Sequence, residues 1–361
     1  MDVRLKSSIR IILCPLAAIL GVLAMPSSAS AQPFGAWLTY SGAPMHSYIQ
    51  VPHSSALNPT NRLTVEAWVN LRDANGGNLC SSIAGKNWRQ AWWLGICGTN
   101  LRTYVKGEGS SRTAGTLPVG TWTHVALVFT GTKRIHYING EQVLNVDETG
   151  PLTTSTSPLR IGSDVQWQFT PEGSIDDVRI WNVARTQAQI RASINKDLTG
   201  AQTGLVAHYK LDANANDARG SHNGALMGTG AGFLTFPVAP NCFATGTFLC
   251  LAERFAISTK YRTSATPGAP PDLNAIAVAP SSNSSGVMAF PNADTWQILA
   301  NVINACAAPS PHFTVALSSP SSLFTRTEVF DIRAGINRIY FHWPGPPTAP
   351  ITDTSAFASC P

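Results

Sequence analysis

Tryptophans gather in one short stretch of the sequence. Trp88, Trp92 and Trp93 lie within six residues, and Tyr104 follows shortly afterwards. Indole and phenol rings stack on sugar rings through dispersion and CH–π contacts, which provide much of the affinity of many carbohydrate sites. Neighbouring residues of a strand point to opposite faces, so one of Trp92 and Trp93 belongs to the core if they share a strand. Trp88 is the first candidate for an exposed ring, Tyr104 the second, and Trp92 or Trp93 the third. Ordinary packing inside a β-sandwich is the alternative for each ring.

Groups suited to catalysis are sparse. The serine-hydrolase elbow Gly-x-Ser-x-Gly is absent, because the segment 220–224 (GSHNG) has its serine one position too early. Glycosidases built on β-sandwiches carry paired carboxylates on one face of a strand, in a pattern such as Glu-x-Asp-x-x-Glu, which places them about 5 Å apart in retaining enzymes. No such spacing occurs, and the nearest pair is Glu172 and Asp176. We therefore expect a protein that is not an enzyme.

Metal ligands are also scattered. None of the eight histidines forms a His-x-His or His-x-x-x-His pair. The segment 212–217 (DANAND) resembles the start of an EF-hand loop, but it lacks the sixth-position glycine and has Asn223 where the loop needs glutamate. A turn is the better interpretation. Asp176 and Asp177 are the candidates for a calcium site, and no other cofactor is expected.

The first 31 residues have the pattern of an export signal. Three basic residues precede an apolar stretch over residues 11–25, and Ala29 and Ala31 stand two apart, as signal peptidase requires. The apolar stretch is shorter than the ~20 residues that span a bilayer. Cys14 lies inside that stretch, without the preceding small residue of a lipoprotein signal. We expect cleavage before Gln32 and a secreted or periplasmic chain with no membrane span.

The charge and cysteine content indicate which partners and which covalent cross-links to expect. Residues 1–31 hold three of the 25 Lys/Arg and one of the 20 Asp/Glu, so 22 basic and 19 acidic residues remain. Because no Lys/Arg cluster occurs, nucleic acid is not an expected partner. Six cysteines remain, and an even number in an exported protein predicts three disulfides. Fifteen pairings are formally possible, and clustering along the chain favours the pairs Cys80–Cys97, Cys242–Cys250 and Cys306–Cys360.

Most of the expected elements are short strands. Apolar residues alternate with mostly polar ones over 63–71, which predicts a strand with one core face. The apolar run 124–129 predicts a strand covered on both faces, and 135–138 ends at Asn139-Gly140, a strong hairpin signal. Residues 175–181 form a further expected strand. One helix is expected: Thr186 and Gln189 form a capping box, Ile190, Ile194 and Leu198 share a face, and Gly200 ends it.

The chain divides near residue 240, where the segment 237–240 reads Pro-Val-Ala-Pro. We expect domains at 32–236 and 242–361, a linker at 237–241, few contacts between the domains, and independent unfolding. The second section predicts another β-sandwich. Its expected strands cover residues 254–261, 296–303, 312–317, 328–333 and 338–343.

Four motifs give the first section a family resemblance. They are 58–69 (NPTNRLTVEAWV), 120–126 (GTWTHVA), 137–140 (YING) and 173–182 (GSIDDVRIWN). In this order they resemble the laminin-G-like, concanavalin A-type jelly-roll domain over roughly residues 36–230. The resemblance implies two packed antiparallel sheets, with Cys80 and Cys97 near one hairpin. The acidic loop that often precedes the family's first strand is replaced by 40–48 (YSGAPMHSY), which removes two potential calcium ligands.

The resemblance also implies a function, since members of this family bind carbohydrate or protein partners. The second section resembles a C-terminal module of bacterial secreted proteins, on the features 249–255, Cys306-Ala307 and 353–360. We therefore expect a secreted, non-catalytic protein that binds a glycan or a cell-surface protein. The alternatives are a polysaccharide hydrolase or lyase with an unfamiliar site, and a structural component of the envelope or matrix.

Overall fold

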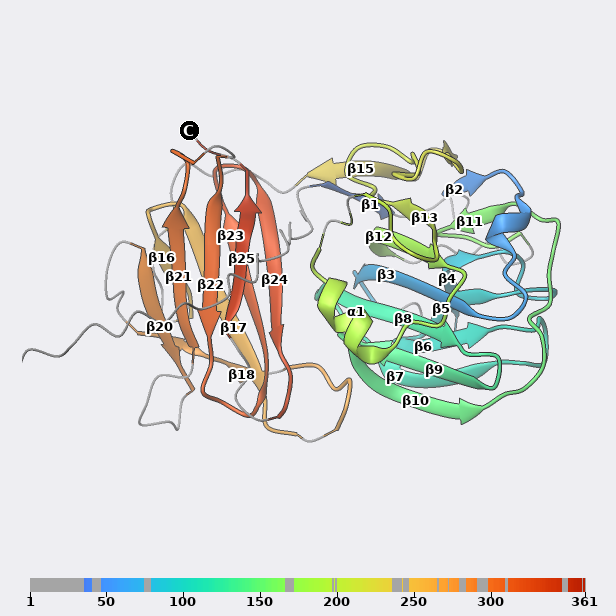
Figure 1. The fold of residues 1–361 in the computed structure, drawn as a ribbon, viewed down its shortest axis with the longest axis horizontal. Helices are drawn as coiled ribbons and strands as arrows, with labels where there is room; N and C mark the ends of the chain where they lie inside the picture. The colour runs from blue at the N-terminus through green and yellow to red at the C-terminus, as the bar shows by residue number, and fades with distance from the viewer. Residues whose placement is uncertain are drawn as a thin grey trace, which may run out of the picture.

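The chain forms two β-sandwiches that lie side by side, with a short helix facing the boundary between them (Figure 1). The predicted all-β fold class is confirmed. The signal segment 1–31, the loop 41–46 and the linker 237–241 lie outside the residues that the computed structural model describes. Those residues are 36–40, 47–74, 79–165, 172–196, 198, 200–235, 242, 247–264, 266–271, 273–278, 284–290, 298–308, 311–345, 350–358 and 360.

The N-terminal sandwich consists of an eight-stranded and a seven-stranded antiparallel sheet. The first has the order β10-β9-β8-β3-β12-β1-β15, with β13 also paired to β12. Its strands are β1 (Ala36–Tyr40), β3 (Leu63–Leu71), β8 (Thr123–Phe129), β9 (Lys133–Ile138), β10 (Glu141–Asp147), β12 (Gly173–Trp181), β13 (Leu205–Tyr209) and β15 (Ala231–Thr235).

The seven-stranded sheet has the order β14-β2-β11-β4-β5-β6-β7. A 3-10 helix, η1 (Ser55–Leu57), follows its strand β2. The strands are β2 (Tyr48–Val51), β4 (Cys80–Gly85), β5 (Trp93–Cys97), β6 (Asn100–Tyr104), β7 (Arg112–Thr116), β11 (Leu159–Ile161) and β14 (Ala225–Met227).

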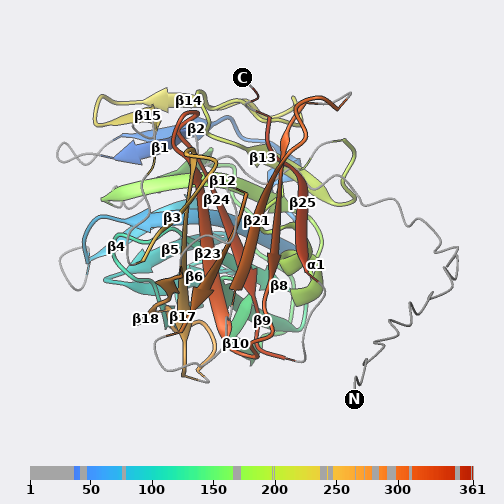
Figure 2. The same ribbon diagram turned by 90° about the vertical axis from the view of Figure 1, so that its left-hand side faces the viewer.

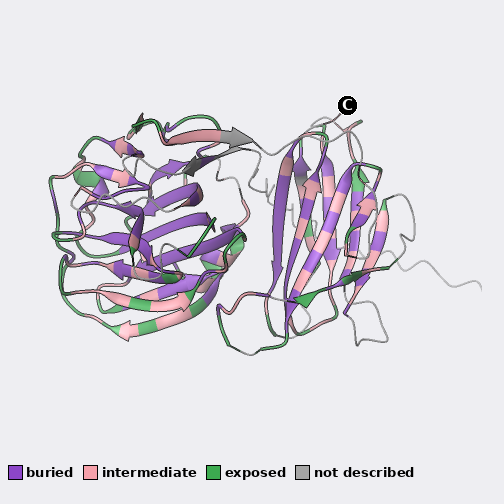
Figure 3. Ribbon diagram, turned by 180° about the vertical axis from the view of Figure 1, so that it is seen from behind, coloured by how far each residue is buried: buried purple, intermediate pink, exposed green. Residues whose placement is uncertain are grey.

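Alternation decides which side chains fill the space between these sheets. On β3, the five predicted core residues at odd positions from Leu63 to Leu71 all join the core, and Val125, Leu127 and Phe129 of β8 meet them. The intervening residues of both strands are almost all buried too, so the middle of this sheet is covered on its outer face as well (Figure 3). The prediction that 124–129 is covered on both faces is confirmed.

The structure confirms the predicted hairpin turn and the predicted helix start in the first domain. Asn139 and Gly140 both have positive φ, of 49° and 74°, at the predicted hairpin. Thr186 caps helix α1 (Gln187–Ser193), and its hydroxyl and the Gln189 side chain make the reciprocal bonds of a capping box. The expected helix end at Gly200 is wrong, because α1 ends at Ser193. Side chains from the sheet bind the carbonyls there: Arg179 donates to Ser193 O and Trp68 Nε1 donates to Ile194 O.

The C-terminal sandwich has two antiparallel sheets of five strands each. Its strands β17, β21 and β22 alternate between buried and partly exposed residues, as sheets with one core face do (Figure 3). One sheet contains β16 (Leu249–Leu251), β17 (Phe255–Arg262), β18 (Leu273–Asn274), β23 (Phe324–Asp331) and β24 (Ile336–His342). The other contains β19 (Ile276–Ala277), β20 (Ser285–Ala289), β21 (Ile298–Asn304), β22 (Phe313–Ser318) and β25 (Ile351–Phe357). Residues 296 and 297 of one predicted strand lie outside the described residues.

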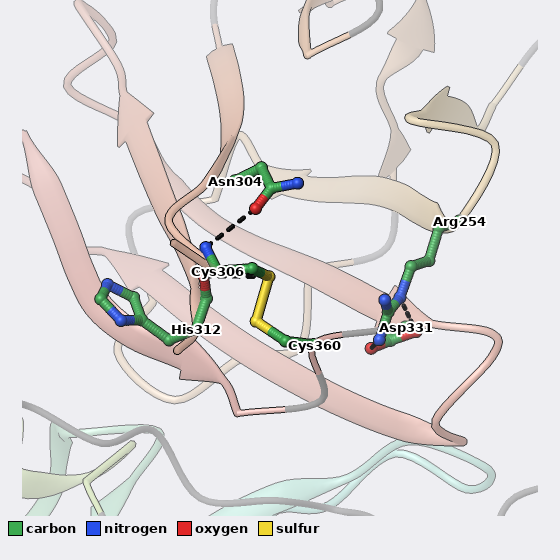
Figure 4. Close-up of a disulfide and its surroundings, with 6 residues drawn as sticks. All are labelled: Arg254, Asn304, Cys306, His312, Asp331 and Cys360. Carbon is green, nitrogen blue, oxygen red and sulfur yellow. Dashed lines mark hydrogen bonds and ion pairs between the residues drawn. A yellow bond between two sulfur atoms is a disulfide. The ribbon is translucent and has the colours of Figure 1, made fainter. Parts of the chain in front are cut away.

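The structure contains the three predicted disulfides, Cys80–Cys97, Cys242–Cys250 and Cys306–Cys360. The last of these ties the C-terminal segment to the end of β21, in the same region as a buried ion pair between Arg254 and Asp331 (Figure 4). Each bridge is expected to stabilise the fold by about 2–4 kcal/mol.

The two domains share an apolar interface, so the expectation of few contacts between them is wrong. Trp68 of β3 stacks on Phe341 of β24, with ring centroids 6.0 Å apart and an interplanar angle of 11°. Trp122, Ile194 and Phe324 belong to the same buried cluster. Figure 2, seen from the side of the C-terminal domain, shows its strands running across the N-terminal sheets. The outer face of the first domain carries large apolar side chains such as Trp68 and Trp122, and the second domain buries them. A Pro-rich segment between two domains does not prevent such packing.

Polar contacts frame this interface. Arg262 donates to the Glu141 carboxylate at 2.7 Å, and the backbone N–H of Gly268 donates to the same side chain at 2.9 Å. Trp343 Nε1 donates to Asn139 O at 2.8 Å. The hairpin at Asn139-Gly140 therefore serves the second domain as well as its own sheet.

Candidate ligand-binding site

The outer faces of the two N-terminal sheets differ in what covers them. The C-terminal domain and α1 cover the outer face of the eight-stranded sheet, where Glu66 is fully buried. The Arg185 guanidinium lies 2.5 Å from one oxygen of Glu66, and His124 Nε2 lies 3.3 Å from the other. Burial alone would raise the pKa of Glu66, but Arg185 and His124 outweigh it and lower that pKa to about 2. These charges are structural, because nothing reaches them from solvent.

The outer face of the seven-stranded sheet carries the predicted aromatic residues. Gly85 of β4 pairs with Trp93 of β5, and Trp93 pairs with Tyr104 of β6. Paired residues of adjacent strands project on the same side of a sheet. Leu94 and Ile96, which alternate with Trp93, belong to the core, so Trp93 and Tyr104 both project outward.

Two glycines make room for the Trp93 indole. It lies across Gly85 on the neighbouring strand and Gly95 on its own strand, and a Cβ atom at either position would overlap the ring. Gly95 is two residues from Trp93 and therefore shares its face. Because these positions lack side chains, the ring lies against the backbone of the sheet and is only 3% exposed.

Trp88 and Tyr104 complete the aromatic cluster. The centroid of the Tyr104 ring is 5.4 Å from that of Trp88 and 5.6 Å from that of Trp93. Both Trp88 and Tyr104 are partly exposed. The loop that carries Trp88 is closed by Lys86 N–H donating to Trp92 O, and Asn87 at its start has a φ of 112°. The Trp88 N–H donates to Asp164 Oδ2 at 3.3 Å.

These three rings line one cleft of about 400 Å³. We call it the aromatic cleft; its lining residues are Cys80, Trp88, Trp93, Arg102, Tyr104, Glu108, Gly109 and Ser111. Two donors in its lining have no acceptor among the described residues, the Trp93 Nε1–H and the Arg102 Nε–H, and both atoms are buried. A buried donor without an acceptor costs about 1–3 kcal/mol. The cleft therefore combines aromatic ring surface with the charged side chains of Arg102 and Glu108.

Three of the candidate rings, Trp88, Tyr104 and Trp93, line this cleft, and of the alternatives Trp92 and Trp93 it is Trp92 that belongs to the core. Trp92 was a candidate for ligand binding, but it is fully buried and its Nε1 donates to Leu57 O at 3.1 Å. The two adjacent tryptophans do face opposite ways, as expected. Arg102, Glu108 and the two glycines were missed. The available signal was the i, i+2 spacing of Arg102 with Tyr104 and of Trp93 with Gly95.

The calcium candidates lie on the covered side of the domain. Both oxygens of Asp177 are engaged, one by the His208 ring at 2.5 Å and the other by the Arg179 guanidinium at 2.5 Å. Asp176 is buried, and burial together with the charges of Asp177 and Asp212 holds its pKa well above the ordinary value. Within the described ranges, no three His, Cys, Asp or Glu side chains cluster as a metal site. Asp177 fits calcium poorly because the Arg179 guanidinium already pairs with its carboxylate, and calcium at Asp176 stays a prediction.

Ser54, His222 and Asp217 lie close together in space, in that order, but they do not form a catalytic triad. Ser54 Oγ is 3.1 Å from His222 Nε2, and His222 Nδ1 is 3.5 Å from Asp217 Oδ2. Asp217 accepts four backbone N–H groups, from residues 208, 219, 221 and 222. Its carboxylate thus holds a turn, as was expected for the segment 212–217, and Ser54 caps η1.

The family comparison agrees with this architecture. Residues 42–191 match a family model, Laminin_G_3, of the concanavalin A-like lectin/glucanases superfamily. These residues form a laminin-G-like domain. Within the described part of the chain, no helix is both long and apolar enough to cross a membrane.

Solved structures similar to the chain include three from different organisms. A candidate carbohydrate-binding protein from Bacteroides ovatus has 24% identity and a TM-score of 0.46, with 56% of this chain and 60% of that chain covered. Domains LG4-5 of the mouse laminin α1 chain have 12% identity and a TM-score of 0.35, with 92% and 86% covered. Domain 4 of the Geobacillus stearothermophilus arabinanase AbnA, in complex with arabinotriose, has 18% identity and a TM-score of 0.34, with 45% and 97% covered. Among curated proteins, no match was found.

Proposed function

We propose that this protein is a secreted, non-catalytic binding protein whose laminin-G-like domain recognises carbohydrate at the aromatic cleft. The observation that supports this most directly is the cluster of three aromatic rings that lines one cleft, in which Trp88 and Tyr104 are partly exposed. The faces of a sugar ring can contact Trp88 and Tyr104, and the polar side chains of Arg102 and Glu108, which line the same cleft, can bond its hydroxyls.

A binding role fits this cleft better than catalysis. Glycoside hydrolysis uses two carboxyl groups that flank the scissile bond, whereas Glu108 is the one carboxylate among the described residues that line the cleft. The three disulfides fit an oxidising compartment outside the cytoplasm.

A glycan array probed with the purified protein, with and without calcium, tests the proposal. The Trp88→Ala variant removes partly exposed stacking surface worth about 0.5–1.5 kcal/mol, so binding should weaken roughly two- to tenfold at an unchanged melting temperature. Trp92→Ala should instead destabilise the domain by about 3–5 kcal/mol.

Phe248→Ala provides the matched control, because Phe248 is an exposed ring of the C-terminal domain. It should change neither binding nor stability. If no glycan binds the wild-type protein, or if folded Trp88→Ala binds as well as the wild type, carbohydrate recognition at this cleft is ruled out.

A further inference from the structure

The disulfide between Cys80 and Cys97 lies on the same side of the seven-stranded sheet as the aromatic cleft. The two cysteines pair directly across β4 and β5. Cys97 lies an even number of positions after Trp93 on β5, so the two side chains project on one face. Leu94 and Ile96, which alternate with them, belong to the core. Both sulfurs therefore project outward, and Cys80 is part of the cleft lining.

The disulfide continues the floor that the Trp93 indole begins. The indole lies over Gly95, the position of β5 between Trp93 and Cys97 on this face, where a Cβ atom would overlap the ring. The bridge therefore borders the far end of the indole. Arg102 of β6 pairs with Gly95 and lies beside both. Because Cys80 and Cys97 are partly exposed, a small molecule in the cleft can reach the bridge.

The Arg102 guanidinium contacts both sulfurs. Its Nη1 donates to Cys80 Sγ at 3.7 Å and to Cys97 Sγ at 3.6 Å. A positive charge beside a cysteine sulfur stabilises the thiolate relative to the thiol, and a more stable thiolate leaves a disulfide faster. The two distances are nearly equal, so Arg102 favours the departure of either sulfur.

The other two disulfides lack this arrangement. Cys306 and Cys360 pack against the core of the C-terminal sandwich, and Cys306 Sγ lies 3.8 Å from the backbone oxygen of His312. Among the described residues, no lysine or arginine side chain donates to these sulfurs or to those of Cys242 and Cys250. The bridge at the cleft is therefore the one that we expect a thiol to open first.

Strands β4 and β5 do not depend on the bridge for their pairing. On one side of it the register continues as far as Gly85 and Trp93. On the other side the Gly98 N–H donates to Leu79 O at 3.0 Å. Opening the bridge therefore changes the cleft while the sheet stays in place.

We propose that the Cys80–Cys97 bridge is a thiol–disulfide exchange site for a small dithiol, and that its opening weakens ligand binding at the aromatic cleft. One thiolate of the dithiol attacks a cysteine sulfur, forms a mixed disulfide with it and releases the other cysteine as a thiolate. The second thiol of the dithiol then attacks the dithiol's own sulfur in this mixed disulfide and releases the second cysteine. The cysteines gain two electrons and two protons, and the dithiol becomes a disulfide.

The effect on binding rests on the proposed function, in which Arg102 bonds sugar hydroxyls. In the oxidised protein the guanidinium contacts neutral sulfurs. After reduction, a cysteine thiolate accepts a charge-assisted hydrogen bond from the same guanidinium and competes with the sugar for it. We expect glycan affinity to fall roughly tenfold, as for the loss of one hydrogen bond to a charged group.

Differential alkylation tests the exchange without any glycan. The folded protein is incubated with dithiothreitol, freed thiols are blocked with iodoacetamide, and peptide mass spectrometry measures each cysteine. Cys80 and Cys97 should be alkylated together, and about fivefold faster than the other four cysteines. Arg102→Gln should slow their alkylation about threefold, and Arg102→Lys, which keeps the charge, should slow it less. Arg62→Gln removes an exposed arginine before β3 and should leave the rate unchanged.

The glycan array measures the effect on the cleft. Glycans bound by the oxidised protein should bind roughly tenfold more weakly in dithiothreitol. The double variant Cys80→Ser/Cys97→Ser has no thiolate to attract Arg102. It should bind within about threefold of the oxidised wild type and should not respond to dithiothreitol. Its melting temperature should be roughly 5–15 °C lower, because one bridge is missing.

The outcomes separate the exchange site from the proposed function. Equal opening rates for the three bridges, or an unchanged rate in Arg102→Gln, would overturn the exchange site. Exchange without any change in glycan binding would overturn its control of the cleft, and so would a double variant that binds as weakly as the reduced protein. If no glycan binds the oxidised protein, the proposed function and the control of the cleft both fail, whereas alkylation alone decides the exchange site.

Discussion

The two outer faces of the laminin-G-like domain carry similar residue types but behave in opposite ways. Each has tryptophan and arginine side chains, which come from its strands and from the loops beside them. On the eight-stranded sheet, Trp68 and Arg185 are buried by the C-terminal domain and α1, and the charge is matched by Glu66. On the seven-stranded sheet, Trp88 stays partly exposed and Arg102 has no carboxylate partner in the described part of the chain. What packs over a face decides whether its aromatic residues are structural or available to a ligand.

The covered face should be the more sensitive to loss of a single charge. Glu66→Gln leaves Arg185 buried without its counter-ion, so the free energy of unfolding should fall by about 3–5 kcal/mol. Urea titration measures this. Glu172→Gln is the matched control, since Glu172 pairs with Arg72 in solvent and its loss should cost less than about 1 kcal/mol. Equal losses in both variants would contradict the distinction.

The ion pair between Arg185 and Glu66 makes the free energy of unfolding depend on pH. Because the pKa of Glu66 is lowered from 4.5 to about 2 in the folded protein, the unfolded chain binds more protons between these values. The stabilisation is therefore complete above about pH 4.5 and declines as the pH falls toward 2. Glu66→Gln should lose this component of the acid dependence.

The interface itself should couple the unfolding of the two domains. In the wild-type protein we expect one calorimetric transition, because the cluster of Trp68 and Phe341 is shared between the domains. Phe341→Ala should lower stability by about 3 kcal/mol and separate the transitions. Phe357→Ala, which truncates a ring inside the C-terminal sandwich, should destabilise without removing that shared contact. Two transitions in the wild-type protein would show that the domains are independent.

Much of the fold, and less of the site, could be predicted from the sequence. Alternation over β3, the apolar run of β8 and the capping box at Thr186 are local patterns, and local geometry fixes their outcome. The orientation of Trp92 and Trp93 depends on where β5 begins, which the sequence alone did not decide. The contact between Trp68 and Phe341 joins strands of different domains, and no periodicity in either strand encodes it. The contact of Arg102 with both sulfurs is equally hidden, because it joins β6 to the bridge between β4 and β5.

The smallest expected effect concerns Asp176, on the covered side. Its raised pKa means that the folded protein holds a proton that the unfolded chain releases, so stability falls as the pH rises above about 3.8. Asp176→Asn should remove this cost and raise stability at neutral pH by on the order of 1 kcal/mol, with no gain near pH 3. Thermal melts across this range measure it. A calcium-dependent rise in melting temperature that vanishes in Asp176→Asn would instead identify a calcium ligand.

The glycines beneath Trp93 imply a pattern of change among related sequences. An indole at position 93 can lie flat only while positions 85 and 95 have no side chain, so we expect the three positions to change together. Any coding change at either glycine adds atoms under the ring, and selection on ligand recognition would then act on residues that a ligand does not touch. Related chains with a small residue at position 93 are free to vary at 85, whereas those with an aromatic residue there are expected to keep glycine at both.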